Sequence, residues 1–174
     1  LNVSLSREYD GTTSVSGASL TPTFDSLQGG ETLALSGTGS ISNANVGSSK
    51  AVTLGTIALA AGSGNPSNYT LNSATMNITQ RVINLDGIRA YDATTNVLSS
   101  DINTFGNIVS GETLTISGTG SVGTNSVAMN KAITIGSLSL GNGSGLASNY
   151  TLTGGTNTFD ISPVSVNVTG SRQY

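Results

Sequence analysis

The sequence predicts a mostly β protein made of two tandem, small β-rich modules arranged end to end. Apolar residues alternate with polar ones over short stretches, which is the pattern of strands with one buried face. Glycine interrupts these stretches often, as is typical of turns and bulges. The chain also repeats itself, because residues 7–13 (Arg-Glu-Tyr-Asp-Gly-Thr-Thr) return as residues 89–95 (Arg-Ala-Tyr-Asp-Ala-Thr-Thr). Such a repeat in a chain of 174 residues predicts two small domains.

The repeat also predicts the domain boundaries. The first module is expected at residues 1–81, the second at 82–163, and the first strand of a third, truncated repeat at 164–174. Related segments mark the three starts: Leu-Asn-Val at 1–3, Ile-Asn-Leu at 83–85 and Val-Asn-Val at 166–168. The Arg-x-Tyr element begins a third time at residues 172–174. Since the joining segments near 80–81 and 162–163 are very short, we expect neighbouring modules to be tightly coupled.

The strands are expected in the same order in each module. In the first, alternation predicts strands at residues 1–5 and 31–36, a pair of strands around Gly55, and a last strand that includes Met76 and Ile78. The alternation changes phase at Gly55 and again at Gly136, which indicates a bulge or a sharp bend. The apolar positions of the second module are Leu114, Ile116, Ile133, Ile135, Leu138, Leu140, Phe159 and Ile161.

The sequence leaves room for at most a short helix per module. The best candidates are residues 42–50 and their counterparts 123–131, although neither segment has a sustained apolar stripe. Residues 61–67 and 141–148 are rich in glycine, serine and asparagine and are expected to be loops.

The composition excludes several classes of function. Only 9% of residues are charged and the net charge is −3 without a basic run, which argues against nucleic acid as a partner. No apolar stretch approaches the roughly 20 residues of a membrane span, so we expect no membrane insertion. The chain has no cysteine and no histidine, which removes disulfides, thiol catalysis and the commonest general base and metal ligand. We therefore expect no enzyme and no cofactor, in a composition that fits a secreted bacterial surface protein.

Four ordered motifs occur in both copies. In the first copy they read Tyr-Asp-Gly-Thr-Thr at 9–13, Gly-Glu-Thr-Leu to Ser-Gly-Thr-Gly at 30–39, Asn-Val-Gly-Ser-Ser-Lys-Ala-Val at 45–52 and Asn-Tyr-Thr-Leu at 68–71. This pattern resembles the YDG repeats of large bacterial adhesins, the filamentous-haemagglutinin-like exoproteins. The second copy departs from it at Ala93, which replaces the glycine, and at residues 126–128 (Ser-Val-Ala).

The resemblance implies β-grasp-like modules of a stalk on the cell surface, with neighbouring repeats of the same chain as partners. Glycan or host-surface binding would then belong to other domains. The alternative is an adhesive module that itself binds glycan or a host or matrix protein, with duplication serving avidity.

The Tyr-Asp element is the sharpest motif in the chain. One interpretation of Tyr9, Asp10, Tyr91 and Asp92 is a ligand or calcium site. The other is a turn in which the aspartate accepts backbone N–H bonds while the tyrosine packs at the edge of a module.

Calcium needs about six to eight oxygen ligands, and the chain offers few carboxylates. Asp10, Asp25 and Glu31 are scattered in the sequence, and a site between modules would use Asp86 or Asp160. Calcium therefore remains an alternative to a chain without cofactors.

Tyr69 and Tyr150 recur within the Asn-Tyr-Thr-Leu motif. The chain has eight tyrosine and phenylalanine residues together and no tryptophan, which favours core packing for these tyrosines over a sugar-stacking surface. Six Asn-x-Ser/Thr sequons also occur, which are either glycosylation acceptors or chance occurrences in a chain rich in these residues. They are Asn2, Asn68, Asn77, Asn142, Asn149 and Asn167.

The two lysines raise a further alternative. Lys50 and Lys131 occupy the same module position, as do Glu31 and Glu112, and Asn68 and Asn149. An isopeptide crosslink would join Lys50 to Asn68 with help from Glu31, because the reaction needs a desolvated lysine beside a carboxyl group. The competing interpretation is a surface lysine at the start of a strand and an asparagine in a turn.

Overall fold

The computed structural model describes residues 1–172, which form two compact units. The first unit comprises Leu1–Arg81 together with Ser148–Tyr150, and the second comprises Val82–Ala147 and the chain from Thr151 onward. Both units are mostly β, with single-turn 3₁₀ helices and no α-helix among the described residues, which confirms the predicted class of small β-rich modules.

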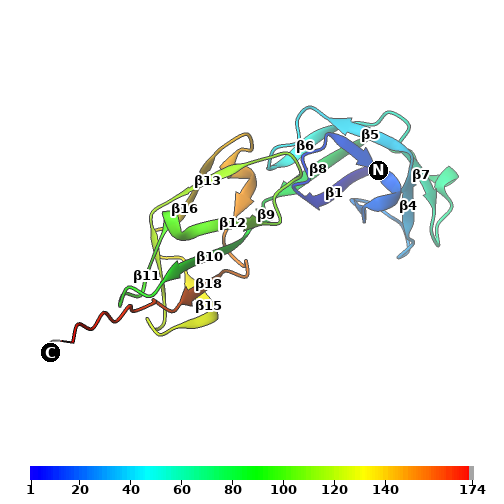
Figure 1. The fold of residues 1–174 in the computed structure, drawn as a ribbon. Helices are drawn as coiled ribbons and strands as arrows, with labels where there is room; N and C mark the ends of the chain where they lie inside the picture. Colours follow the sequence, from blue (N-terminus) through cyan, green and yellow to red (C-terminus); the bar gives the residue numbers. More distant parts are fainter. Residues whose placement is uncertain (173–174) are drawn as a thin grey trace. The chain divides into compact units, whose positions relative to one another are not determined.

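The first unit contains a six-stranded sheet and a two-stranded sheet. The large sheet has the order β2-β5-β6-β8-β1-β3, and β4 pairs with β7 (Figure 1). The strands are β1 (Asn2–Glu8), β2 (Ser14–Ser16), β3 (Thr23–Phe24), β4 (Leu33–Ser36), β5 (Thr38–Ile41), β6 (Gly47–Thr53), β7 (Ala58–Ala61) and β8 (Ser73–Thr79). The 3₁₀ turns are η1 (Gly17–Ser19) and η2 (Pro66–Asn68).

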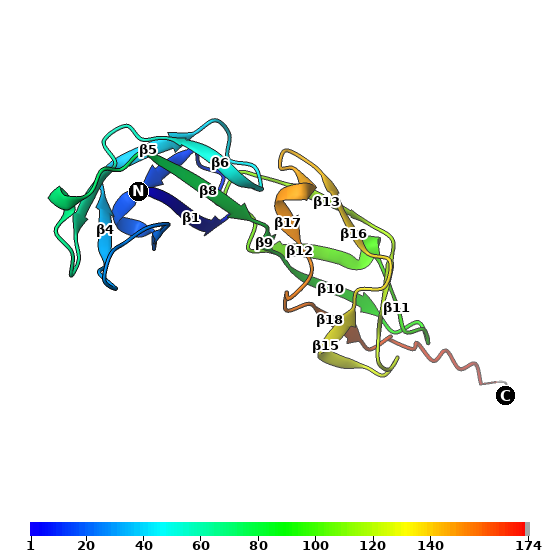
Figure 2. The same cartoon turned by 180° about the vertical axis from the view of Figure 1, so that it is seen from behind.

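The second unit repeats this topology, with the order β11-β14-β15-β18-β10-β12 and the pair β13-β16 (Figure 2). Its strands are β10 (Asn84–Ala90), β11 (Asn96–Leu98), β12 (Ile102–Gly106), β13 (Leu114–Ser117), β14 (Thr119–Val122), β15 (Ala128–Thr134), β16 (Ser139–Asn142) and β18 (Thr158–Ser162), with η3 (Ser99–Asp101). The short elements β9 (Arg81–Val82), η4 (Ala147–Asn149) and β17 (Tyr150–Thr151) lie where the chain changes unit.

The first and last long strands of each unit are parallel neighbours. β1 pairs with β8 over seven residue pairs, from Asn2 opposite Ser73 to Glu8 opposite Thr79. β10 pairs with β18 over five residue pairs, from Asp86 to Ala90 along β10. Antiparallel strands flank both pairs. Each unit is therefore closed by pairing the beginning of its repeat with the end of the same repeat.

The two cores are filled differently at one central position. In the first unit Leu5 lies opposite Met76, and both side chains are buried. In the second unit Gly87 lies opposite Phe159, which is also buried. A Cβ atom at Gly87 would lie 2.9 Å from the Phe159 ring, so the missing side chain makes room for the larger aromatic one.

The predicted phase changes are turns. Gly55 and Gly136 both have φ 57° and follow β6 and β15, which confirms the sharp bends expected there. Gly37 cannot be replaced by a residue with a side chain. It has φ 75°, and a Cβ atom there would lie 2.0 Å from the Thr56 carbonyl oxygen. This glycine lets the chain pass from β4 in the small sheet to β5 in the large one.

The candidate segments for a short helix, residues 42–50 and 123–131, form no helical turn. Strands β6 and β15 occupy the second half of these segments, and each pairs with the last long strand of its unit. The missing apolar stripe gives the physical reason, because a helix there would bury nothing.

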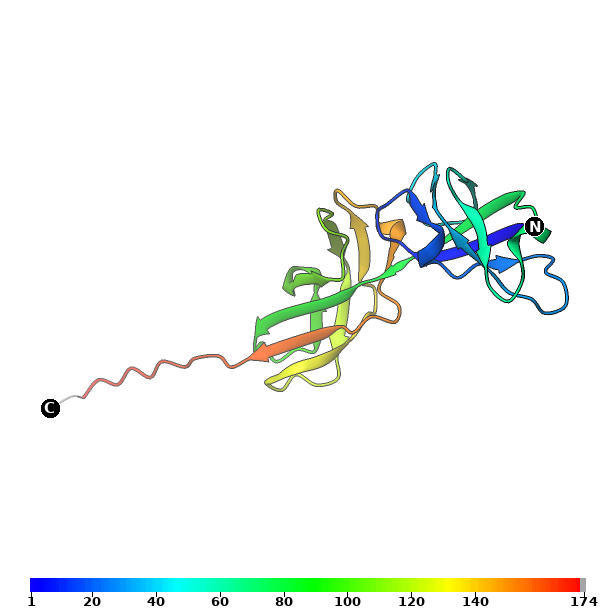
Figure 3. The same cartoon turned by 90° about the vertical axis from the view of Figure 1, so that its right-hand side faces the viewer.

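Residues 163–172, which include most of the expected first strand of a third repeat, form no strand (Figure 3). In both units the first strand is held by the last strand and the antiparallel strand of its own repeat, and the described chain offers no such partners to this segment. Gln173 and Tyr174 lie outside the described residues.

Candidate functional site

The Arg-x-Tyr-Asp element forms a closed turn after β1. The Asp10 carboxylate accepts hydrogen bonds from the backbone N–H and the hydroxyl of Thr12, at 2.9 and 3.0 Å. The Arg7 guanidinium donates to the carbonyl oxygens of Thr12 and Ser14 and lies 3.3 Å from the Asp10 carboxylate. The charged groups thus hold the chain between β1 and β2 in place.

The second unit keeps this turn despite its changed sequence. Asp92 accepts from the backbone N–H and the hydroxyl of Thr94, and the Thr94 amide is the main cause that lowers the pKa of Asp92 below its usual value. Ala93 takes φ 64° where Gly11 takes φ 76°. The turn therefore survives the loss of glycine, at the cost of a strained alanine.

Asn149 belongs to the second sequence repeat but is part of the first structural unit. Its side chain is 1% exposed, accepts a hydrogen bond from the Val46 amide at 2.9 Å, and donates one to the Asn45 side chain at 3.0 Å. Asn149 thus satisfies the backbone at the start of β6.

Tyr150 lies beside it on the same end of the first unit. Its ring meets Tyr9 edge-on, with 5.4 Å between centroids, and the two residues are 2% and 4% exposed. The Gln80 side chain donates to the carbonyl oxygens of Ser148 and Tyr150, at 3.2 and 2.9 Å. The aromatic contact and these hydrogen bonds hold the segment Ser148–Tyr150 in the first unit.

The residues proposed for an isopeptide crosslink are not brought together as expected. The Lys50 ammonium donates to the Asn43 side chain at 2.7 Å and to the Asn45 carbonyl at 2.9 Å, so it supports the loop that holds Asn149 rather than meeting Asn68. Lys131 makes the corresponding contact with Thr124 at 2.8 Å.

Glu31, the proposed assisting carboxylate, accepts a hydrogen bond of 2.5 Å from the Tyr69 hydroxyl, and this bond is the main cause that raises the pKa of Tyr69. Its counterpart Glu112 lies at the start of the segment before β13, and Asn68 is exposed at the end of η2.

The acidic residues considered for calcium have separate partners. Asp10 closes its turn, Asp25 is bound by Asn2, and Glu31 by Tyr69. In the second unit Asp86 accepts from Thr158 and Asp160 from the Asn130 amide. Among residues 1–172 no three acidic side chains gather into a metal-binding group.

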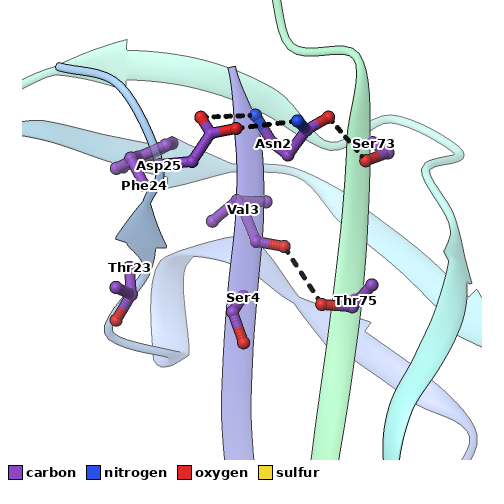
Figure 4. Close-up of a pocket in the computed structure, with 8 residues that line it drawn as sticks. All are labelled: Asn2, Val3, Ser4, Thr23, Phe24, Asp25, Ser73 and Thr75. Atoms are coloured by element: carbon purple, nitrogen blue, oxygen red, sulfur yellow. Dashed lines mark hydrogen bonds between the residues drawn. The ribbon is translucent and has the colours of Figure 1, made fainter.

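A groove of about 250 Å³ lies over β1, β3 and β8 of the first unit (Figure 4). Asp25 accepts hydrogen bonds from the backbone and side-chain amides of Asn2, at 3.0 and 2.7 Å, and Asn2 in turn accepts one from Ser73. The Asn2 backbone amide is the main cause that lowers the pKa of Asp25. With the half-buried Phe24 beside them, these polar groups form a candidate small-ligand site.

The sequons differ in their surroundings. Asn149 is buried, while Asn68 and Asn167 are exposed. The side chains of Asn2, Asn77 and Asn142 accept hydrogen bonds within their own unit.

Sequence reasoning missed the residues that hold Ser148–Tyr150. Asn45 and Val46 belong to a motif that we quoted, but nothing in one sequence pairs that motif with the Asn-Tyr of the following copy. Gln80 carried no signal because it stands alone between two strands.

Two copies of one small sheet fold with repeating turn motifs define a tandem-repeat protein of β modules. The sequence matches the YDG domain over residues 2–76 and again over residues 77–159, and the chain therefore belongs to the YDG domain family. No curated protein and no solved structure matches it. No helix among residues 1–172 has the length and apolarity to cross a membrane.

Proposed function

We propose that this chain is a stalk segment of a secreted bacterial surface adhesin, whose repeats add length and project a binding region from the cell. Membership of the YDG family and the resemblance of the motifs to adhesin repeats support the proposal. It assigns no catalysis and no cofactor to the chain.

The parallel pairing of the first and last strands is the observation that carries the proposal. Tension on a stalk pulls each repeat at its two ends, and in the first unit those ends leave from β1 and β8. Because the strands are parallel neighbours, the force runs along them and strains all the bonds between them together. Antiparallel neighbours joined at one end would instead open one bond at a time. The seven pairs of β1–β8 and the five pairs of β10–β18 suit a protein that is held under tension.

Single-molecule stretching from the two ends of the chain tests this function. We expect two unfolding events at high force, with the longer β1–β8 pairing giving the stronger of the two. A control attached through residues 41 and 73, the last residue of β5 and the first of β8, pulls across the sheet and should open at clearly lower force. Equal forces in the two geometries would contradict a role under tension.

Binding assays test the same proposal independently, because they ask whether the chain itself has a ligand. A stalk segment should bind no glycan, matrix protein or cell in a saturable way. Saturable binding to the intact chain would favour the alternative, an adhesive module.

The groove around Asn2 and Asp25 is the specific observation that favours this alternative. A carboxylate, an amide and an aromatic ring are the groups that proteins commonly offer to sugar hydroxyls and sugar faces. In the second unit Gly106 occupies the position of Asp25, so the carboxylate of this groove is particular to the first unit. Glycan binding that is lost in Asp25→Ala would establish it, with Asp86→Ala as the control.

A further inference from the structure

One end of the second unit is apolar and open. A groove of about 260 Å³ runs between the start of β15 and the end of β18. Its apolar lining includes Ile88, Val127 and Met129, which are 48%, 48% and 75% exposed. Tyr91, whose amide donates to Ser162 in the groove wall, is 41% exposed. Exposed side chains of this size in one place usually mark a surface that binds another protein.

The repeat identifies what covers this surface. In the first unit the corresponding end carries Tyr9 and Val46, and there Ser148–Tyr150 occupies it. Tyr91 and Val127 stand at the same positions of the second repeat. Within residues 1–172 the structure shows no acceptor for the Val127 amide, whereas the Val46 amide is bound by Asn149.

A second copy of this segment lies in the first unit, where Ser67 and Asn68 are exposed and Tyr69 is half-buried. Residues 67–69 (Ser-Asn-Tyr) have the same sequence as Ser148–Tyr150. Asn68 is exposed, in contrast to Asn149, which is 1% exposed. The chain therefore carries one such end that is occupied, one that is open, and a second copy of the occupying segment in which Ser67 and Asn68 are exposed.

We propose that this end of the second unit binds residues 67–69 of a second copy of the chain. The interface is head-to-tail, so it adds copies in an open row rather than closing a ring of two. The inference rests on the proposed function, because it names the contact by which neighbouring copies of a stalk would hold one another.

The contact differs in chemistry from its counterpart in the first unit. Ser126 replaces Asn45 and Pro163 replaces Gln80, so two side-chain amides that bind Ser148–Tyr150 are missing. Apolar side chains are added instead, since Ile88 stands where the first repeat has Ser6, and Met129 where it has Ser48. Binding at this end of the second unit therefore relies on apolar contact around Tyr91 and on the Val127 amide.

Disulfide trapping tests the proposal, because the chain contains no cysteine. Full chains that carry Ser126→Cys are mixed with full chains that carry Asn68→Cys, at the positions equivalent to the bonded pair Asn45 and Asn149. We expect their mixed disulfide to form at least about ten-fold faster than that of Ser126→Cys with Ser48→Cys, an exposed position on the same unit as Asn68; this ratio corresponds to a docking free energy of about 1.4 kcal/mol.

A second substitution confirms the site. Met129→Asp in the Ser126→Cys chain should bring the rate down to that of the control, since it places a charge in the apolar groove. Met129 is 75% exposed, so the chain with this change should fold as before. Equal rates for all pairs, with every variant folded, would overturn the proposal. The stalk function fails separately, through a saturable ligand or through equal forces in the two pulling geometries.

Discussion

The two units share one topology but differ in what they leave exposed. Among residues 1–172 all nine large apolar side chains that are exposed belong to the second unit. The same motif tyrosine is 4% exposed as Tyr9 and 41% exposed as Tyr91. Tyr9 owes part of its burial to Tyr150, so a segment of the second sequence repeat completes the surface of the first unit.

The cores of the two units differ in one pair of facing residues. Leu5 with Met76 and Gly87 with Phe159 fill the same place at the centre of the sheet. The larger partner on the last strand is matched by the missing side chain on the first. The second unit therefore accommodates a larger side chain on one strand by omitting the side chain opposite it on the neighbouring strand.

Leu5→Gly should lower the stability of the first unit more than any other change considered below. It removes a buried side chain and places glycine within a strand, so we expect the first unit to lose about 4 kcal/mol of stability. Adding Met76→Phe should recover part of this loss, because the pair then matches Gly87 and Phe159. Hydrogen exchange followed by mass spectrometry reads the stability of each unit separately. If the two changes add without any recovery, volume matching is the wrong explanation.

Asn149→Ala should have the next largest effect. It leaves the Val46 amide without its acceptor, which costs about 1 to 2 kcal/mol in the first unit. Asn68→Ala is the matched control and should change stability little, since Asn68 is exposed. Amide exchange at Val46, measured by NMR, should accelerate only in the Asn149 variant. Acceleration of equal size in both variants would show that the two positions are equivalent after all.

The sequence predicted the fold class and the repeat because both depend on local patterns. The alternation that contains Leu33 and Leu35 gave β4, and both side chains are buried in the structure. The candidate segment at residues 42–50 forms no helix because β6 is held by its pairing with β8, which no local pattern reveals.

The candidate site was harder to predict for the same reason. Asn149 lies 104 positions from its partner Asn45 and 103 positions from Val46. A single sequence shows that both motifs recur, but it does not show that one copy of the Asn-Tyr motif serves the preceding unit. We therefore placed Lys50 beside Asn68, whereas its loop holds Asn149.

Ala93→Gly should have a smaller effect, and it should be favourable. Ala93 has φ 64°, a conformation that glycine adopts without strain, so the second unit should gain about 1 kcal/mol. Gly11→Ala should cost the first unit a similar amount. Thermal unfolding of the two variants checks this, because the melting temperature should rise in one and fall in the other. A change of the same sign in both would mean that the two turns differ in more than this residue.

Lowering the pH should have the smallest effect on stability. It should act through Asp25 in the first unit and through Asp92 in the second. Backbone amides of Asn2 and Thr94 are the main causes that lower the pKa values of Asp25 and Asp92 below 3.8. Both groups therefore stabilise the fold fully above pH 3.8, and this contribution is lost as the pH falls through their lower folded values. Asp25→Asn should remove the dependence from the first unit only, and Asp92→Asn from the second only. NMR titration of the side-chain carboxyl carbons checks the direction, and a midpoint above 3.8 for either group would contradict the hydrogen bonds that these two carboxylates accept.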